Sequence, residues 1–154
     1  MKFPSSKSRP AAALFSAALA GASTPAAAID YKAIEPAAAI LYDTPSAKGR
    51  KLFLLRKYTP VEVIVAVEGF VKVREPEGAI GWVEKKALGD RRQVIVTAAK
   101  AQVRGEARTD AAPVFEAEKG VALELVDPPK DGWAKVKHVS GQVGMVRVTQ
   151  VWGL

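Results

Sequence analysis

Residues 69–83 read Gly-Phe-Val-Lys-Val-Arg-Glu-Pro-Glu-Gly-Ala-Ile-Gly-Trp-Val, and this stretch decides the fold. Apolar and polar residues alternate from Phe70 to Arg74, as they do in a strand with one buried face. The next four residues, Glu75 to Gly78, are typical of a turn, because proline fixes φ and glycine accepts a positive φ. A second strand then begins at Ile80. The stretch therefore predicts two short strands around a turn.

The same pattern returns 63 positions later in the chain. The segment 132–136 (Gly-Trp-Ala-Lys-Val) echoes 69–73, and the segment 141–146 (Gly-Gln-Val-Gly-Met-Val) echoes 78–83. These two copies of one small β-unit indicate two domains of the same kind in tandem.

Each unit is predicted to hold about five short strands, spaced as small barrels space them. In the first unit, a leading segment at 29–36 precedes strands at 37–42, 51–56, 61–67 and within 69–83, and a helical turn at 85–88 closes the unit. In the second unit, strands are expected at 94–96, 101–104, 114–115, 122–125, 132–136 and 143–146, with a firm turn at 127–131 and a closing turn at 147–150. The strand at 94–96 could pair with either unit. No segment shows a long helical period, so the predicted fold is all-β.

The boundary between the units is predicted at the polar segment 89–92. The first barrel then covers residues 29–90 and the second covers residues 91–154. A domain of about 60 residues buries little surface on folding, and the chain has no cysteine to form disulfides. We therefore expect the two barrels to dock on each other.

Residues 1–28 have the pattern of a secretory signal peptide. A basic start carries Lys2, Lys7 and Arg9, an alanine-rich apolar run follows, and the segment ends in Ala-Ala-Ala at 26–28. The run is too short and too rich in alanine for a spanning helix, which needs about 20 apolar residues. We expect cleavage after Ala28, a periplasmic or secreted mature chain and no stable insertion in the membrane.

Much of the apparent basicity belongs to that leader. Without residues 1–28, which carry three basic and no acidic residues, the formal net charge falls from +7 to +4. The remaining charges are interspersed rather than clustered, so a nucleic-acid partner is not expected.

The two units resemble the bacterial SH3 domain family. In the first unit the matching motifs are Pro60–Val63, Gly69–Val73 and Gly78–Val83. In the second unit they are Val103-Arg104, Gly120, Leu123–Leu125, Gly132–Val136, Gly141 and Gly144. The first unit has Leu41-Tyr42 in place of the Val-Arg pair, and the second has Met145 in place of the usual tryptophan. The resemblance implies two SH3-like barrels whose ligand is a peptidoglycan peptide or an envelope protein.

No group of residues in the sequence supports an enzyme. The absence of cysteine excludes thiol nucleophiles and thiolate metal sites. The single histidine, His138, lacks a cysteine partner for a metal and an obvious serine partner for a triad, so it is expected to face solvent on a strand. Glu75 and Glu77 flank a proline and fit a solvated turn better than an acid–base pair. We expect no metal, no cofactor and no catalysis.

Candidate binding residues gather in the first unit. Tyr42 and Tyr58 lie at predicted loop edges, where a tyrosine ring can face both solvent and a ligand, although tyrosine also packs in cores. Trp82 and Trp133 could line a peptide groove, but rings of this size are expected mainly in the core. The densest basic patch lies beside Tyr42 and could hold carboxylates, although such runs are usually solvated. The predicted ligand-binding set is Tyr42, Tyr58, Trp82, Lys48, Arg50 and Lys51.

The resulting hypothesis is an exported, non-catalytic binding module of two SH3-like domains. The alternative is a structural accessory protein that assists assembly of the envelope and binds no small ligand.

Overall fold

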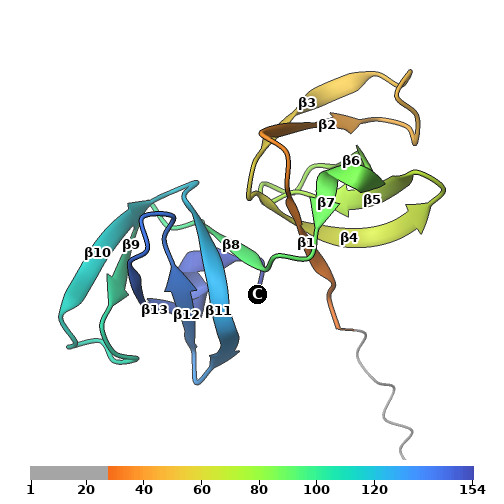
Figure 1. Ribbon diagram of the computed structural model, residues 1–154. Helices are drawn as coiled ribbons and strands as arrows, with labels where there is room; N and C mark the ends of the chain where they lie inside the picture. The colour runs from red at the N-terminus through yellow and green to blue at the C-terminus, as the bar shows by residue number, and fades with distance from the viewer. Residues whose placement is uncertain (1–27) are drawn as a thin grey trace, which may run out of the picture.

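The computed structural model describes residues 28–154, so the signal-peptide prediction lies outside the described residues except for Ala28. The chain forms two antiparallel sheets of seven strands, each curled into a small barrel (Figure 1). This confirms the predicted all-β fold of two tandem SH3-like barrels. No helix of residues 28–154 is long and apolar enough to cross a membrane.

The first sheet has the strand order β3-β2-β6-β5-β4-β1-β7. Its elements are β1 (Tyr31–Ile34), β2 (Ala38–Tyr42), β3 (Lys51–Arg56), β4 (Pro60–Val67), β5 (Phe70–Arg74), β6 (Ile80–Glu84), the 3₁₀ turn η1 (Lys85–Ala87) and β7 (Leu88–Gly89). The leading segment predicted at 29–36 thus contributes a strand, β1, which pairs with β4 and β7.

The second sheet repeats this order as β10-β9-β13-β12-β11-β8-β14. Its elements are β8 (Gln93–Val96), β9 (Lys100–Arg104), β10 (Pro113–Glu118), β11 (Ala122–Lys130), β12 (Trp133–Lys137), β13 (Val143–Arg147), the 3₁₀ turn η2 (Val148–Gln150) and β14 (Val151–Trp152). The strand predicted at 94–96 is β8, and it pairs with β11 and β14 of its own barrel.

The two barrels are copies down to single turns. Tyr58 donates its backbone N–H to the carbonyl of Ile34 at 2.7 Å, and Gly120 donates to the carbonyl of Val96 at 2.8 Å. Both residues have a positive φ, 67° for Tyr58 and 88° for Gly120. Glycine adopts this conformation without strain, whereas tyrosine does so at a cost. The repeated pattern of the sequence is therefore a repeated backbone.

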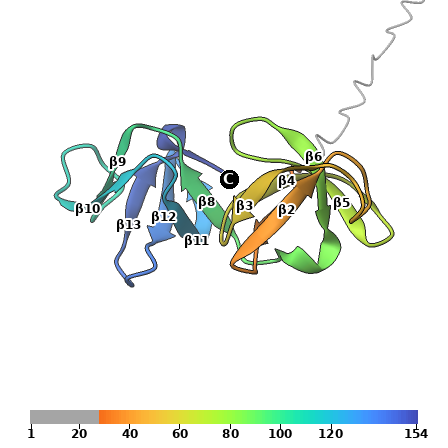
Figure 2. The same cartoon turned by 90° about the horizontal axis from the view of Figure 1, so that it is seen from above.

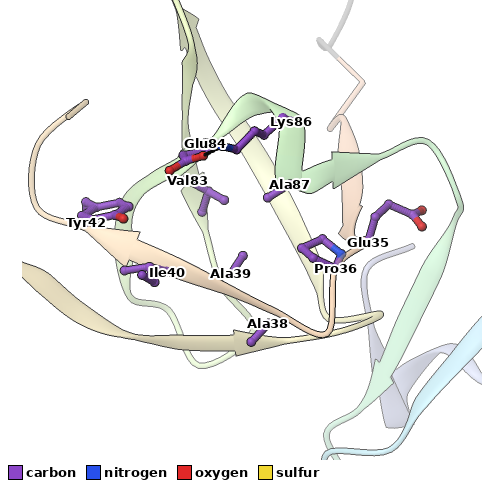
Figure 3. A pocket seen from close by; sticks show the side chains of 10 residues that line it. All are labelled: Glu35, Pro36, Ala38, Ala39, Ile40, Tyr42, Val83, Glu84, Lys86 and Ala87. Carbon is purple, nitrogen blue, oxygen red and sulfur yellow. Dashed lines mark ion pairs between the residues drawn. The ribbon is translucent and has the colours of Figure 1, made fainter. Parts of the chain in front are cut away.

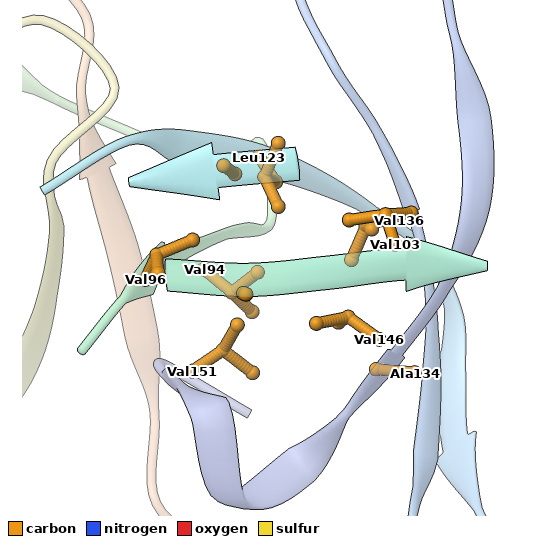
Figure 4. Packing of buried hydrophobic residues seen from close by; sticks show 10 residues of the cluster. Val94, Val96, Val103, Leu123, Ala134, Val136, Val146 and Val151 are labelled. Carbon is orange, nitrogen blue, oxygen red and sulfur yellow. The ribbon is translucent and has the colours of Figure 1, made fainter. Parts of the chain in front are cut away.

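Each barrel has its own apolar core. In the second barrel valines and alanines from six strands meet inside the sheet, centred on Val94, Val103, Leu123, Val136 and Val146 (Figure 4). In the first barrel the corresponding cluster contains Ile34, Leu41, Val61, Val73 and Val83. Most of these positions alternate with exposed or half-buried ones, which is why the sequence pattern located the strands.

A glycine in each barrel allows two strands to approach closely. A Cβ atom on Gly81 of β6 would lie 2.6 Å from Cγ of Leu41 and 2.8 Å from the carbonyl oxygen of Tyr42. A Cβ atom on Gly144 of β13 would lie 2.6 Å from Cγ1 of Val103 and 2.7 Å from the carbonyl oxygen of Arg104. The Gly-Xaa-Val motif therefore recurs because a larger residue would push these strands apart.

Two details of the predicted turns are wrong. The segment 127–131 is not a turn, because β11 continues to Lys130 and the reversal is made by Asp131 and Gly132 alone. The strand tolerates its two prolines because the pairing with β12 is irregular between Asp127 and Lys130. Glu75 is buried rather than solvated, and its carboxylate accepts backbone N–H groups from Glu77 at 3.0 Å and Ala79 at 2.7 Å.

The barrels meet near the C-terminus, which lies between them in both views (Figures 1 and 2). The ring of Tyr31 in β1 packs edge-on against the ring of Trp152 in β14, with centroids 5.1 Å apart. Arg92 donates a hydrogen bond to the carbonyl of Gly153 at 3.0 Å, and its guanidinium lies 5.7 Å from the centroid of Tyr31. These contacts agree with the expectation that the barrels dock.

Candidate functional site

A groove of about 590 Å³ opens on the first barrel where β2 and β6 diverge. The two strands are paired only at Tyr42 and Trp82, and the groove lies beside the rest of β2. Figure 3 shows its lining side chains, which come from β2, β6, η1 and the connection after β1. They are Glu35, Pro36, Ala38, Ala39, Ile40, Tyr42, Val83, Glu84, Lys86 and Ala87.

The floor of this first groove is apolar and its rim is charged. Three successive residues of β2 line it, Ala38, Ala39 and Ile40, and Val83 and Ala87 add apolar surface. On the rim Lys86 forms an ion pair with Glu84 at 2.7 Å, which raises the pKa of the Lys86 ammonium. Glu35 lies at the other side of the opening (Figure 3). A groove of this kind can hold an extended peptide with small apolar side chains.

Tyr42 lines the first groove but does not face solvent as the sequence predicted. Only 5% of its surface is exposed, because its ring packs edge-on against Phe70 with centroids 6.1 Å apart. Trp82 is its cross-strand partner on β6, so the two side chains lie on the same face of the sheet. Lys72 lies over the Trp82 ring at 5.8 Å from its centroid. The structure thus brings Tyr42 and Trp82 together and adds Phe70, which sequence analysis did not select.

The two tryptophans, expected as core or half-core rings, are half-buried in the first barrel and buried in the second. Trp82 is half-buried and does not belong to the apolar cluster of its barrel. Trp133 is only 6% exposed, but it too lies outside the cluster of the second barrel, with the guanidinium of Arg147 at 4.8 Å from its ring centroid. These rings therefore cover the outer face of each sheet.

The second barrel has a groove of about 350 Å³ in the equivalent place. Its lining residues are Lys100, Gln102, Arg104, Thr109, Trp133, Arg147 and Gln150. Lys100, Gln102 and Arg104 stand where the first barrel has Ala38, Ile40 and Tyr42. Likewise, Arg147 stands where the first barrel has Glu84. The same architecture therefore presents an apolar groove in one barrel and a cationic groove in the other.

The cations of the second groove are held in place by their neighbours. Arg104 donates to the carbonyl of Ala111 at 2.6 Å and to the side chain of Gln102. Lys100 pairs with Glu116 at 3.0 Å, which raises the pKa of the lysine and lowers the pKa of the glutamate. Positioned guanidinium groups suit carboxylates, with which they form paired hydrogen bonds. Sequence analysis missed this groove, although a position-by-position comparison of the two copies would have shown the change of charge.

Tyr58 lies at the junction of the barrels rather than at the first groove. Its ring has Lys57 Nζ at 5.1 Å and the Arg91 guanidinium at 5.8 Å from its centroid. It lines a separate cavity of about 170 Å³ together with residues of the second barrel, among them Glu124 and His138. The predicted ligand-binding residues therefore lie in two places, because Tyr42 precedes β3 and Tyr58 follows it.

The predicted basic patch lies in and after the loop that joins β2 to β3. Arg50 is engaged with Asp43, both by an ion pair at 3.5 Å and through its backbone N–H at 2.9 Å. Lys48 and Lys51 are exposed and do not line the first groove. The patch therefore flanks the start of β3.

His138 lies in the turn after β12, where it has the serine partner that the sequence did not reveal. Its Nδ1 lies 2.8 Å from Oγ of Ser140 and accepts the Ser140 backbone N–H at 3.2 Å. The ring is tilted against Phe115, with centroids 5.7 Å apart. Within the described range, no group of three or more histidine, aspartate or glutamate side chains could hold a metal ion. The contact stabilises a tight turn, since both partners belong to the same three residues.

Comparison with known protein families gives a match within the first barrel. Residues 37–89 match the family model for the bacterial SH3 domain, which confirms the resemblance over this unit. No curated protein sequence matches the chain at a significant level.

Three solved structures are similar to the chain at low sequence identity. NlpC2 from Trichomonas vaginalis is 15% identical, with a TM-score of 0.38 over 81% of this chain and 48% of its own. NlpC1 from the same organism is 16% identical, with a TM-score of 0.38, and the match covers 84% of this chain and 48% of NlpC1. An NlpC/P60 family protein from Bacillus cereus is 16% identical, with a TM-score of 0.38 over 80% and 56%. The chain thus spans about half the length of these structures.

Proposed function

We propose that the mature chain, residues 29–154, is an exported, non-catalytic binding module that recognises an acidic peptide of the bacterial cell wall. The match to the bacterial SH3 domain supports a role at the cell envelope. The observation that carries the proposal is the first groove, whose apolar floor of Ala38 and Ile40 ends at the buried ring of Tyr42.

The two grooves complement each other as sites for one kind of ligand. The first groove offers apolar contact for small side chains. The second groove offers Arg104 and Arg147, which suit carboxylates. A peptide with alternating methyl groups and carboxylates has the chemistry that both grooves accept.

The test is capture of the mature chain by purified peptidoglycan. Ile40→Glu places a charge on the floor of the first groove, and we expect it to reduce the captured fraction. Because Ile40 is paired with Leu54, which is 64% exposed, it lies on the outer face and its replacement leaves the core intact. The matched control is Ile64→Glu, which makes the same replacement at a 43% exposed position of β4 that lines neither groove.

Two outcomes of this experiment contradict the proposal. Capture of Ile40→Glu at the level of the unchanged chain would show that the first groove is not the site. Failure of the unchanged chain to bind peptidoglycan would reject this ligand class. The thermal melting of each variant, followed by circular dichroism, shows that a loss of capture is not a loss of fold.

Export is a separate part of the proposal, because it depends on the leader alone. The basic start, the short apolar run and the alanines at 26–28 support cleavage before Ile29. Intact-mass measurement of protein from the periplasmic fraction is expected to give a chain that starts at Ile29. Protein that keeps Met1 and stays in the cytoplasm would contradict export.

A second candidate function is assembly with an envelope protein, without a small ligand. The observation that favours it is the exposed edge strand β3, whose apolar side chains face solvent.

A further inference from the structure

Strand β3 is an unguarded edge of the first sheet. Among the strands of residues 28–154 it pairs only with β2, so the backbone groups on its other side have no strand partner. Figure 1 shows β3 at the outer border of the first barrel, with β2 on its inner side. A row of unpaired N–H and C=O groups is a template for pairing with another extended chain.

The side chains of β3 are apolar and largely exposed. Leu52 is 36% exposed, Phe53 is 41% exposed and Leu54 is 64% exposed, whereas Leu55 points into the core with 4% exposure. Proteins normally protect an edge with proline, charged side chains or a bulge, since a long apolar edge promotes aggregation. The pairing with β2 is irregular at Leu52, but neither a proline nor a charged side chain interrupts the four residues from Leu52 to Leu55.

The equivalent edge strand of the second barrel, β10, carries those devices. It begins at Pro113 in place of Lys51, and it has Glu116 in place of Leu54 and Glu118 in place of Arg56. Glu116 is held by Lys100 at 3.0 Å. The two strands share the irregular pairing near their start, but the first lacks the proline and the central charge of the second. The difference indicates that β3 has a partner.

The two ends of β3 are positively charged. Lys48 and Lys51 lie at its start, and Arg56 and Lys57 lie at its end; all four are exposed. In the part of the chain that the structure describes, no ion pair joins any of them to an acidic side chain. The edge thus presents an apolar centre between two basic ends.

This charge pattern argues against a second copy of β3 as the partner. In the antiparallel register that overlays Leu52 with Leu55, each Lys51 lies opposite an Arg56. A shift by one residue in either direction places Arg50 opposite Arg56, or Lys51 opposite Lys57. Like charges directly opposite each other destabilise a strand pair, and here the repulsion occurs at both ends.

We propose that β3 binds an extended segment of a partner protein that has an apolar centre of about four residues and acidic residues at both ends. The segment adds to the first sheet as a further strand beside β3. Its backbone bonds to the open edge, its apolar side chains cover Leu52 and Leu54, and its carboxylates face Lys51 and Arg56. Leu54 is the cross-strand neighbour of Ile40, but no residue of β3 lines the first groove, so the inference does not depend on binding of a cell-wall peptide.

The test uses the mature chain and two synthetic peptides with the same Val-Ile-Val-Ile centre. One peptide has two glutamates at each end and the other has two lysines at each end. We expect the acidic peptide to bind about tenfold or more tightly than the basic one, and to lose affinity as salt rises, because the flanking charges are exposed. Backbone NMR shifts on binding are expected to centre on residues 51–56.

Three variants separate this model from non-specific binding. Leu54→Glu gives β3 the charge that guards β10, and we expect it to weaken the acidic peptide by about tenfold. The matched control Ile64→Glu, which adds the same charge at a 43% exposed position of β4 away from this edge, is expected to retain binding. Lys51→Glu and Arg56→Glu together reverse the charge at both ends of β3. We expect this double variant to bind the basic peptide more tightly than the acidic one.

The inference is overturned by any of three results. The two peptides could bind with equal affinity, the shifts could centre on the first groove or on β10, or the double charge reversal could leave the preference unchanged. Dimerisation of the free chain in analytical ultracentrifugation that Leu54→Glu abolishes would identify a second copy as the partner and would also reject the proposal. Binding of peptidoglycan in the same preparations is independent of all these results.

Discussion

The contact between Tyr31 and Trp152 predicts that the two barrels unfold as one cooperative unit. The rings meet edge-on at 5.1 Å, and Tyr31 is only 8% exposed although it lies on a short strand near the start of the described residues. Such an aromatic pair contributes about 0.5–1.5 kcal/mol beyond the burial of its area. Trp152→Ala removes burial as well, so we expect it to lower the free energy of unfolding by about 3 kcal/mol, the low end for aromatic truncation, since the ring is half-buried.

A double-mutant cycle with Tyr31→Ala and Trp152→Ala measures the ring contact itself. We expect a coupling energy of about 0.5–1.5 kcal/mol from urea unfolding followed by circular dichroism, which does not depend on the lost tryptophan fluorescence. Tyr31→Phe keeps the ring and is expected to keep the coupling. A coupling within about 0.3 kcal/mol of zero would refute docking through this pair, because distant independent sites are additive to that degree.

Truncation gives a coarser measure of the same junction. A chain that ends at Arg92 loses Trp152. It also loses Gly153, which lies so close to the first barrel that an added Cβ atom would be 3.1 Å from Cβ of Pro60. We expect its first barrel to melt well below the full mature chain, since 1 kcal/mol shifts the melting temperature of a domain this small by about 4–8 °C. Equal melting temperatures would show that docking contributes nothing.

Three further predictions concern stability. Gly81→Ala and Gly144→Ala are each expected to lower the free energy of unfolding in urea by about 1–3 kcal/mol, because the added methyl group meets backbone and side-chain atoms of the neighbouring strand. Unchanged urea midpoints would contradict the close approach of the strands. Gly120→Ala is expected to cost about 1 kcal/mol from its φ of 88° alone, since nothing lies near the added Cβ, and a gain in stability would show that the turn can relax. Burial raises the pKa of the Tyr31 phenol above its ordinary 10.0, so its contribution is complete below pH 10.0 and is lost as pH rises further; urea unfolding across this range should show that Tyr31→Phe lacks this loss.

The position of the first groove shows why the candidate site was only partly predictable. Tyr42 was selected because it follows an apolar run and precedes a polar loop, which is local information. Its burial against Phe70 depends on a strand 28 positions further along the chain, which the local sequence does not specify. Ile40 and Glu84 gave no signal of their own, because an apolar strand residue and a charged strand end are ordinary features.

The sequence by itself determined the strands, most of the turns and the duplication. Alternation along a strand and the backbone preferences of proline and glycine act within a few residues, so the span of β3 from Lys51 to Arg56 could be predicted to the residue. Even the turn at 127–131 was misplaced by only a few positions, since the reversal at Gly132 follows directly.

Only the tertiary structure decided which residues form grooves and which strand forms an open edge. The divergence of β2 from β6 forms an apolar groove in the first barrel, and the same divergence gathers Lys100, Arg104 and Arg147 in the second. The open edge of β3 likewise depends on its place at the border of the sheet, which strand order sets and composition does not. Grooves and edges arise from residues far apart in the chain, so their chemistry is settled when the barrel closes and pairs those residues.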